Sequence, residues 1–308
     1  MIPTHTPPAY TPYDGSSKPF SIGLTPIDLN DWIEPDGDLA TFLAEKKALE
    51  KTHFDNIFLA APESLDAQRE TLALLTEHVT TRHAGIYSRR GDIVEMAGHS
   101  VDLSDETRPP LLRAGSLVQD DLLILRRKED GWTLVAAHLA FPSSWSLPEK
   151  FMKPMDQIHA GVPGFQGGTR NATLINRMFD KLDMNQPVKR YNWSVNWRYA
   201  LYHPRPEKTA IEPNSPGVAA ANAIIRIERQ VLRRLPQTGD LLFTVRIYLD
   251  PLKAIMEAPD GARLAASMAA QLEALEEDQV NYKGLAEKRR ELVDCLLDVA
   301  RQKVASEA

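Results

Sequence analysis

The middle of this chain is organised as two strand-like segments, a helical section and three more strand-like segments, and this order restricts the fold strongly. The first two segments lie in residues 116–141, around a turn at 128–131. The later segments are 187–197, 224–235 and 241–249, and the last two are joined by the short turn PQTG. Short turns join antiparallel neighbours. The pattern therefore predicts an α+β fold with about five antiparallel strands.

Helical periodicity lies on both sides of this series. Apolar residues recur at three- and four-residue spacing from Asp38 onward, from Ser64 onward and again near the C-terminus. A helical crossover between the second and third strands of an antiparallel sheet is typical of a PAS-like fold. We therefore expect a PAS-like sheet flanked by N- and C-terminal helices. Residues 1–22, which contain five prolines, are expected to form an extended arm before a single domain over residues 23–305.

Composition excludes several classes of protein. The net charge of −6 offers no basic excess for a nucleic-acid partner. Cys295 is the only cysteine, so the chain cannot form an internal disulfide or hold an iron–sulfur cluster on four cysteines of its own. The N-terminus lacks the basic start and apolar core of a signal peptide, and no apolar run approaches the roughly 18–20 residues that span a bilayer. We expect a cytoplasmic protein without a membrane segment.

The hairpin around PQTG carries two facing arginines. If Leu235 pairs with Asp240 across the turn, Arg229 lies directly opposite Arg246 on one face of the sheet. Two such cations repel each other unless an anion or an acidic side chain lies between them. Two interpretations stay open: the arginines bind an anion, or they point into water. A register change of one residue would exchange the faces.

The same register places Glu228 on the other, more apolar face, opposite Ile247. A buried carboxylate needs a cation or a hydrogen-bond donor, or else its pKa rises. Glu228 is therefore expected either to pair with a local arginine or to meet a cationic ligand.

A glycine-rich loop follows His159 within the predicted crossover. It lacks the Gly-Lys-Ser/Thr ending of a Walker A loop and the glycine spacing of a dinucleotide fingerprint. Thr169 is expected to cap the helix that follows, and such a helix start attracts phosphates or carboxylates, although a plain turn is the alternative. His159 has no second ligand at zinc spacing. A haem needs only one protein ligand, and its propionates need cations; His159 and the facing arginines together match these needs.

Several segments resemble one family: "LTPIDLNDWIEPD", "LVQDDLLIL", "FPSSWSLPEKFMKPMDQIHAGVPGF", "NWS", "RIERQVLRRLPQTGDLLFTVRIYLDPL" and "YKGLAEKRREL". In content and order they resemble the haem-dependent oxidative N-demethylase alpha-subunit family, over about residues 23–297. The resemblance implies a PAS-like fold that binds haem b and demethylates a small amine with O₂. It also implies that electrons come from a separate reductase with flavin and an iron–sulfur centre. An oligomer is compatible with it.

Roles for individual residues follow from the resemblance and the strand geometry. The histidine that matches the family motif is His159, which is expected to be the axial ligand of the haem iron. The cofactor-binding candidates, proposed by charge, are Arg226, Arg229 and Arg246. The catalytic candidates, expected to hold a protonated amine, are Glu228, Asn192 and Trp193.

Two further possibilities stay open. The protein is then either a haem or small-ligand sensor without turnover, or a PAS-like scaffold that has lost haem and acts as a partner subunit. After "NWS" this chain reads Val-Asn-Trp-Arg, where relatives tend to carry acidic residues. If those acids bind amine, this protein takes a different substrate.

Overall fold

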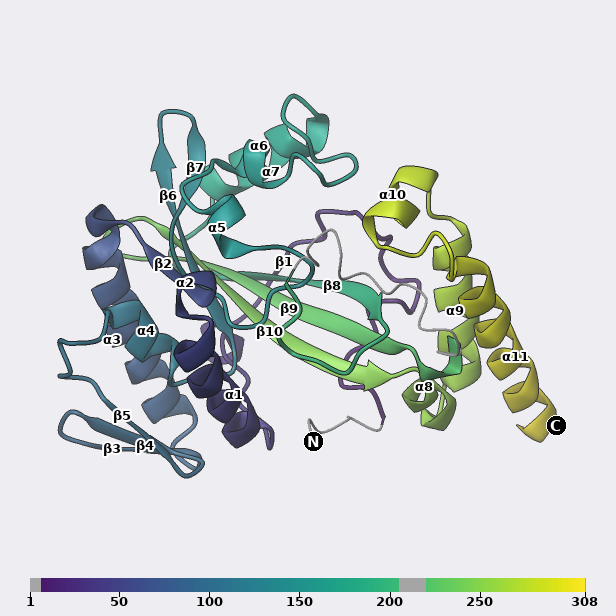
Figure 1. Cartoon of the computed structure of the whole chain (residues 1–308), viewed down its shortest axis with the longest axis horizontal. Coiled ribbons are helices and arrows are strands. Elements are labelled where there is room, and N and C mark those ends of the chain that lie inside the picture. The colour runs from purple at the N-terminus through teal and green to yellow at the C-terminus, as the bar shows by residue number, and fades with distance from the viewer. Residues whose placement is uncertain (1–6, 205–219, 308) are drawn as a thin grey trace.

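The computed structural model describes residues 7–204 and 220–307, and its centre is an antiparallel sheet of seven strands (Figure 1). The strands lie in the order β1-β8-β9-β10-β6-β7-β2. A second sheet of three strands has the order β3-β4-β5. Mixed helix and sheet of this kind confirms the α+β class, but the prediction of about five strands was too low.

The five strands expected from the sequence form the middle of the large sheet. They are β6 (Asp121–Lys128), β7 (Gly131–His138), β8 (Val188–Asn196), β9 (Ile224–Arg234) and β10 (Leu241–Pro251). The two strands that the prediction missed, β1 (Thr25–Pro26) and β2 (Phe58–Ala60), lie at the two edges. They were missed because two or three residues are too few to show an alternating pattern.

One end of one sheet face is covered by the N-terminal helices and the small sheet. The elements are α1 (Leu39–Thr52), α3 (Leu65–Arg82), β3 (Tyr87–Arg90), β4 (Ile93–Met96), β5 (His99–Asp102) and α4 (Pro110–Gly115). The short helix α2 (Phe54–Ile57) leads into the edge strand β2. Leu75 of α3 and Leu111 of α4 share a core cluster with Val231 and Leu242 of the sheet. Ser64 is the N-cap residue of α3, although its side chain makes no capping hydrogen bond.

The other end of this face is covered by the C-terminal helices α8 (Lys253–Glu257), α9 (Gly261–Glu273), α10 (Glu277–Tyr282) and α11 (Arg289–Glu307). Leu264 of α9 and Leu292 of α11 pack against Ile227 of β9 in a second cluster. Residues 7–22 contain neither helix nor strand, yet Tyr13 is fully buried in the same cluster. This segment therefore packs on the sheet.

The crossover between β7 and β8 covers the opposite face with α5 (Leu147–Lys150), α6 (Met155–Ile158) and α7 (Arg170–Asp180), which Figure 1 shows together on one side of the sheet. Phe165 and Phe179 share a third cluster with Ile247. Thr169 caps α7, because its side chain accepts a hydrogen bond from the Ala172 amide at 3.2 Å. No helix in residues 7–204 or 220–307 is long and apolar enough to cross a membrane.

His78 of α3 predicts a pH dependence of stability. Burial, with the charges of His83, Arg233 and Arg82, lowers its pKa from 6.5 to about 4. A base with a depressed folded pKa binds fewer protons when folded, so its contribution to stability is present above pH 6.5 and is lost as the pH falls towards about 4. We expect His78→Phe to flatten this part of the stability curve. Urea unfolding of both proteins between pH 7 and 4 measures it, and parallel curves would contradict the assignment.

Candidate functional site

The hairpin of β9 and β10 has the register that the sequence predicted. The Leu235 amide donates to the Asp240 carbonyl at 2.8 Å, and Arg229 lies opposite Arg246. Because neighbouring side chains on a strand point to opposite faces, Glu228 faces away from Arg229. The sheet therefore has one face with the two arginines and another with Glu228.

The two facing arginines are buried and paired with acids of the same chain. Arg229 has no exposed side-chain surface, and its Nε lies 3.0 Å from Oε1 of Glu34. Nη2 of Arg246 donates to Oδ2 of Asp36 at 2.9 Å. Burial would raise the pKa of Asp36, but the charge of Arg246 and a hydrogen bond from Gln119 outweigh it and lower the pKa. Acidic side chains of the same chain thus meet the arginines, so the interpretation that they point into water is wrong, and their own acids take the place of a bound anion.

His159 lies at the C-terminal end of α6, over the face that carries Glu228. Its ring is 6.1 Å from that of Phe165, and Phe165 packs in the cluster of the crossover with Ile247. Since Arg229 and Arg246 point to the other face, the sheet separates them from His159. The structure therefore does not bring the predicted axial ligand and these two predicted propionate partners into one site.

The imidazole of His159 is held in its neutral form. Burial, together with the positive charges of Lys150 and Arg190, lowers its pKa to about 4. In the part of the chain that the structure describes, neither ring nitrogen makes a hydrogen bond. A neutral imidazole with a free nitrogen is the form that binds a metal ion. His159 thus has the protonation state that an axial ligand needs.

Glu228 is half-buried, and only one of its two carboxylate oxygens accepts hydrogen bonds from described residues. Its Oε2 accepts hydrogen bonds from Nδ2 of Asn192 at 3.3 Å and from Nε2 of Gln230 at 2.6 Å. Asn192 is its direct neighbour on β8. Oε1 accepts no hydrogen bond from any residue within 7–204 or 220–307. Two amide groups thus meet this carboxylate, whereas no described arginine forms an ion pair with it, and one oxygen remains available to a ligand.

Two cations near Glu228 were not among the predicted site residues. Arg190 lies on β8 opposite Gln230, on the Glu228 face, and its charge acts on both His159 and Glu228. Lys283 follows α10, and its Nζ donates to the Trp193 carbonyl at 2.6 Å. The alternation of β8 offered a signal for Arg190, whereas Lys283 had only its place in the segment "YKGLAEKRREL".

The remaining candidates lie on different faces. Trp193 is 4% exposed, belongs to the cluster on the arginine face, and packs its ring 6.1 Å from that of Tyr13. Arg226 shares the face of Glu228 but is fully buried. It donates to Oγ of Ser143 at 2.8 Å and to the carbonyl of Phe141 at 2.7 Å. Burial lowers the pKa of Arg226 to about 10, and its bonds hold the segment that leads into α5.

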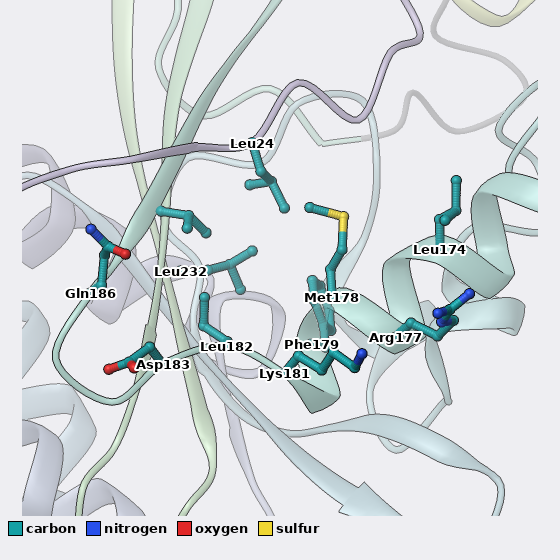
Figure 2. Close-up of a pocket in the computed structure, with 11 residues that line it drawn as sticks. Leu24, Leu174, Arg177, Met178, Phe179, Lys181, Leu182, Asp183, Gln186 and Leu232 are labelled. Atoms are coloured by element: carbon teal, nitrogen blue, oxygen red, sulfur yellow. The ribbon is translucent and has the colours of Figure 1, made fainter.

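A pocket of about 440 Å³ lies between α7 and the sheet (Figure 2). Leu24, Met178 and Leu232 give it an apolar interior, and Figure 2 shows them pointing toward one another. It is on the crossover face, since Leu232 has the same alternation as Glu228. His159 is not one of its lining residues. Its volume lies within the range of small-molecule sites.

Metal binding by a cluster of side chains has no support in the described part of the chain, where no group of three or more His, Cys, Asp or Glu is suitably placed. A cofactor that brings its own metal needs less from the protein, because a haem iron takes one axial side chain. His159 is placed to offer such a ligand.

A comparison with known families agrees with this arrangement. A family model described as haem-dependent oxidative N-demethylase, alpha subunit-like, matches residues 23–293, nearly the whole chain. The matched range includes His159, Arg190, Glu228 and Lys283. This chain therefore belongs to the family of proteins like the alpha subunit of haem-dependent oxidative N-demethylase.

Proposed function

We propose that this protein is a haem-dependent oxidoreductase that removes a methyl group from a small amine, with O₂ and electrons from a separate reductase. One observation carries the proposal beyond the family match. His159, neutral and without a hydrogen bond to any described residue, lies over the sheet face that carries Glu228. A metal ligand and a carboxylate with a free oxygen then share one side of the sheet.

The residues on this face suit a haem b. The imidazole of His159 is available to iron. Arg190 and Lys283 supply positive charge near His159 and Glu228, and the crossover offers apolar surface through Phe165 and its neighbours. Arg226 contributes to the same face by holding the chain that enters the crossover.

Five long strands, with the helices of the crossover packed on one face, also support a PAS-like domain. Across the sheet these strands lie in the order β7, β6, β10, β9, β8. Numbered by their position along the chain, this is the order 2-1-5-4-3. We propose that residues 23–305 form one haem-binding domain of this kind, preceded by an arm over residues 1–22. The family match begins at the same residue, 23.

Glu228 and its neighbours are proposed to hold the substrate. A small secondary amine is protonated at neutral pH, and Oε1 of Glu228 is open to accept its N–H groups. Asn192 and Gln230 orient the carboxylate through Oε2. Trp193, whose ring lies on the opposite face, contributes through its backbone carbonyl, which positions Lys283.

Haem, when bound, supplies the activation of O₂ by electrons that arrive one at a time. The balanced reaction is R–NH–CH₃ + O₂ + 2 e⁻ + 2 H⁺ → R–NH₂ + HCHO + H₂O. The chain has one cysteine, Cys295, so it offers no set of thiolates for an iron–sulfur centre. We therefore assign electron delivery to a partner reductase with flavin and an iron–sulfur centre.

Turnover by haem-loaded protein tests this proposal. Protein produced with added haem is expected to show a Soret band and to release formaldehyde from N-methyl amines when reductase, electron donor and O₂ are present. Glu228→Gln is expected to keep the band but to bind amine about tenfold more weakly in a spectral titration, because it loses the charge of the carboxylate. A Soret band without formaldehyde from any methylamine would favour the sensor, and no band would refute the haem proposal.

A further inference from the structure

More positive charge surrounds Glu228 than this one carboxylate neutralises. Three cations act electrostatically on Glu228: Arg190, Arg226 and Lys283. None of them lies within ion-pair distance of its carboxylate among the described residues. Arg226 is satisfied by neutral oxygens of the chain. The two cations that remain are Arg190 and Lys283.

Arg190 is half-buried, and no described residue pairs with it. Its Nε is inaccessible and makes no hydrogen bond, and in the described part of the chain its guanidinium enters no ion pair. Burial lowers its pKa, although the charge of Glu228 opposes the shift, because a guanidinium that is partly withdrawn from water is less stable in its charged form. An arginine held in this way is costly unless an anion meets it.

Lys283 lies at the edge of β8, close enough for the charges of Arg190 and Glu228 to act on it. Its ammonium group donates one hydrogen bond to the Trp193 carbonyl and lies 4.9 Å from the centre of the Trp193 ring and 5.2 Å from that of Phe20. Burial, together with the charge of Arg190, lowers the pKa of Lys283 to about 8, although Glu228 opposes the shift. Two neighbouring cations that repel each other are stabilised by a ligand of opposite charge.

We infer that Arg190, on the Glu228 face of β8, and Lys283, at the edge of the same strand, together form a carboxylate-binding site next to Glu228. The planar fork of an arginine and the point charge of a lysine together suit a carboxylate. Two sources of this group are compatible with the site: a propionate of the haem, and the carboxylate of an N-methyl amino acid whose ammonium group meets Glu228. The inference rests on the proposed function for the identity of the ligand.

Haem retention tests the first source. Haem-loaded wild type, Arg190→Gln, Lys283→Gln and Arg190→Lys are mixed with excess apomyoglobin, and haem transfer is followed by absorbance. If a propionate occupies the site, each glutamine variant is expected to lose haem about tenfold faster, with partial rescue in Arg190→Lys. The dimethyl ester of haem should erase the difference between the proteins, because it carries no carboxylate.

Ligand affinity tests the second source. Spectral titration of the same proteins compares N-methylglycine with N-methylethylamine, which has no carboxylate. If the substrate carboxylate occupies the site, the glutamine variants are expected to bind N-methylglycine about tenfold more weakly than wild type does. Their affinity for N-methylethylamine should be unchanged. Lys189→Gln is the matched control, since Lys189 is the neighbour of Arg190 on β8 and points to the opposite face.

The outcomes separate this inference from the proposed function. Wild type that never takes up haem would overturn the proposed function itself. Wild type that holds haem, with folded glutamine variants that match it in both haem transfer and N-methylglycine affinity, would overturn the carboxylate site alone. Unfolding curves establish that the variants are folded, and Arg190→Lys keeps the test valid if Arg190→Gln does not fold.

Discussion

His159→Ala is expected to remove the Soret band of the haem-loaded protein. If His159 supplies the only side chain bonded to iron, the variant keeps the sheet face but loses that bond, and haem content should fall about tenfold or more. The ring is half-buried at the end of α6 and makes no hydrogen bond to any described group, so its removal should cost the fold little. Absorption spectra and extracted haem per chain measure the effect.

Two controls make this result specific. His99→Ala changes a histidine of the small sheet, on β5, and should leave the Soret band unchanged. Added imidazole is expected to restore part of the band in His159→Ala, because it can occupy the space of the missing ring and bind iron. Full haem content and an unchanged spectrum in His159→Ala would show that another group is the axial ligand.

Arg229→Gln is expected to lower the free energy of unfolding by about 3 kcal/mol. The guanidinium is fully buried, pairs with Glu34 at 3.0 Å and donates to the carbonyl of Trp32 at 3.0 Å. Glutamine cannot reach all of these acceptors, so a carboxylate and backbone oxygens lose their partner. Urea denaturation at neutral pH measures the change, and an unchanged slope would confirm that the unfolding transition is comparable.

The surface pair of Arg290 and Asp294 offers the matched control. Nε of Arg290 lies 3.2 Å from Oδ2 of Asp294, but the arginine side chain is 87% exposed. Arg290→Gln should therefore lower the free energy of unfolding by only about 0.3–0.5 kcal/mol. The haem content of Arg229→Gln also tests the prediction that Arg229 binds the cofactor. A loss of stability with normal haem retention would indicate that Arg229 ties the chain before α1 to the sheet. A selective loss of haem would support propionate binding instead.

The comparison of sequence and structure is clearest in the hairpin. Alternation and the length of the PQTG turn are local properties, so they sufficed to predict that Arg229 faces Arg246 and that Glu228 faces Ile247. The cap at Thr169 is equally local. The two edge strands were too short to leave such a signal.

The partners of these residues could not be predicted from the sequence. Glu34 and Asp36 lie about two hundred positions before Arg229 and Arg246 in the chain, and no local pattern relates them. Lys283 reaches the edge of β8 only because the C-terminal helices pack on the arginine face.

The sequence by itself determined the five central strands along the chain, the register of the hairpin and the family of the chain. Only the tertiary structure decided that the crossover covers the Glu228 face, and thus that His159 lies with Glu228 and Arg190 rather than with Arg229 and Arg246. The physical reason is that alternation divides a strand into two faces, whereas the choice of which face a helix covers depends on how all the apolar surfaces of the chain are buried together.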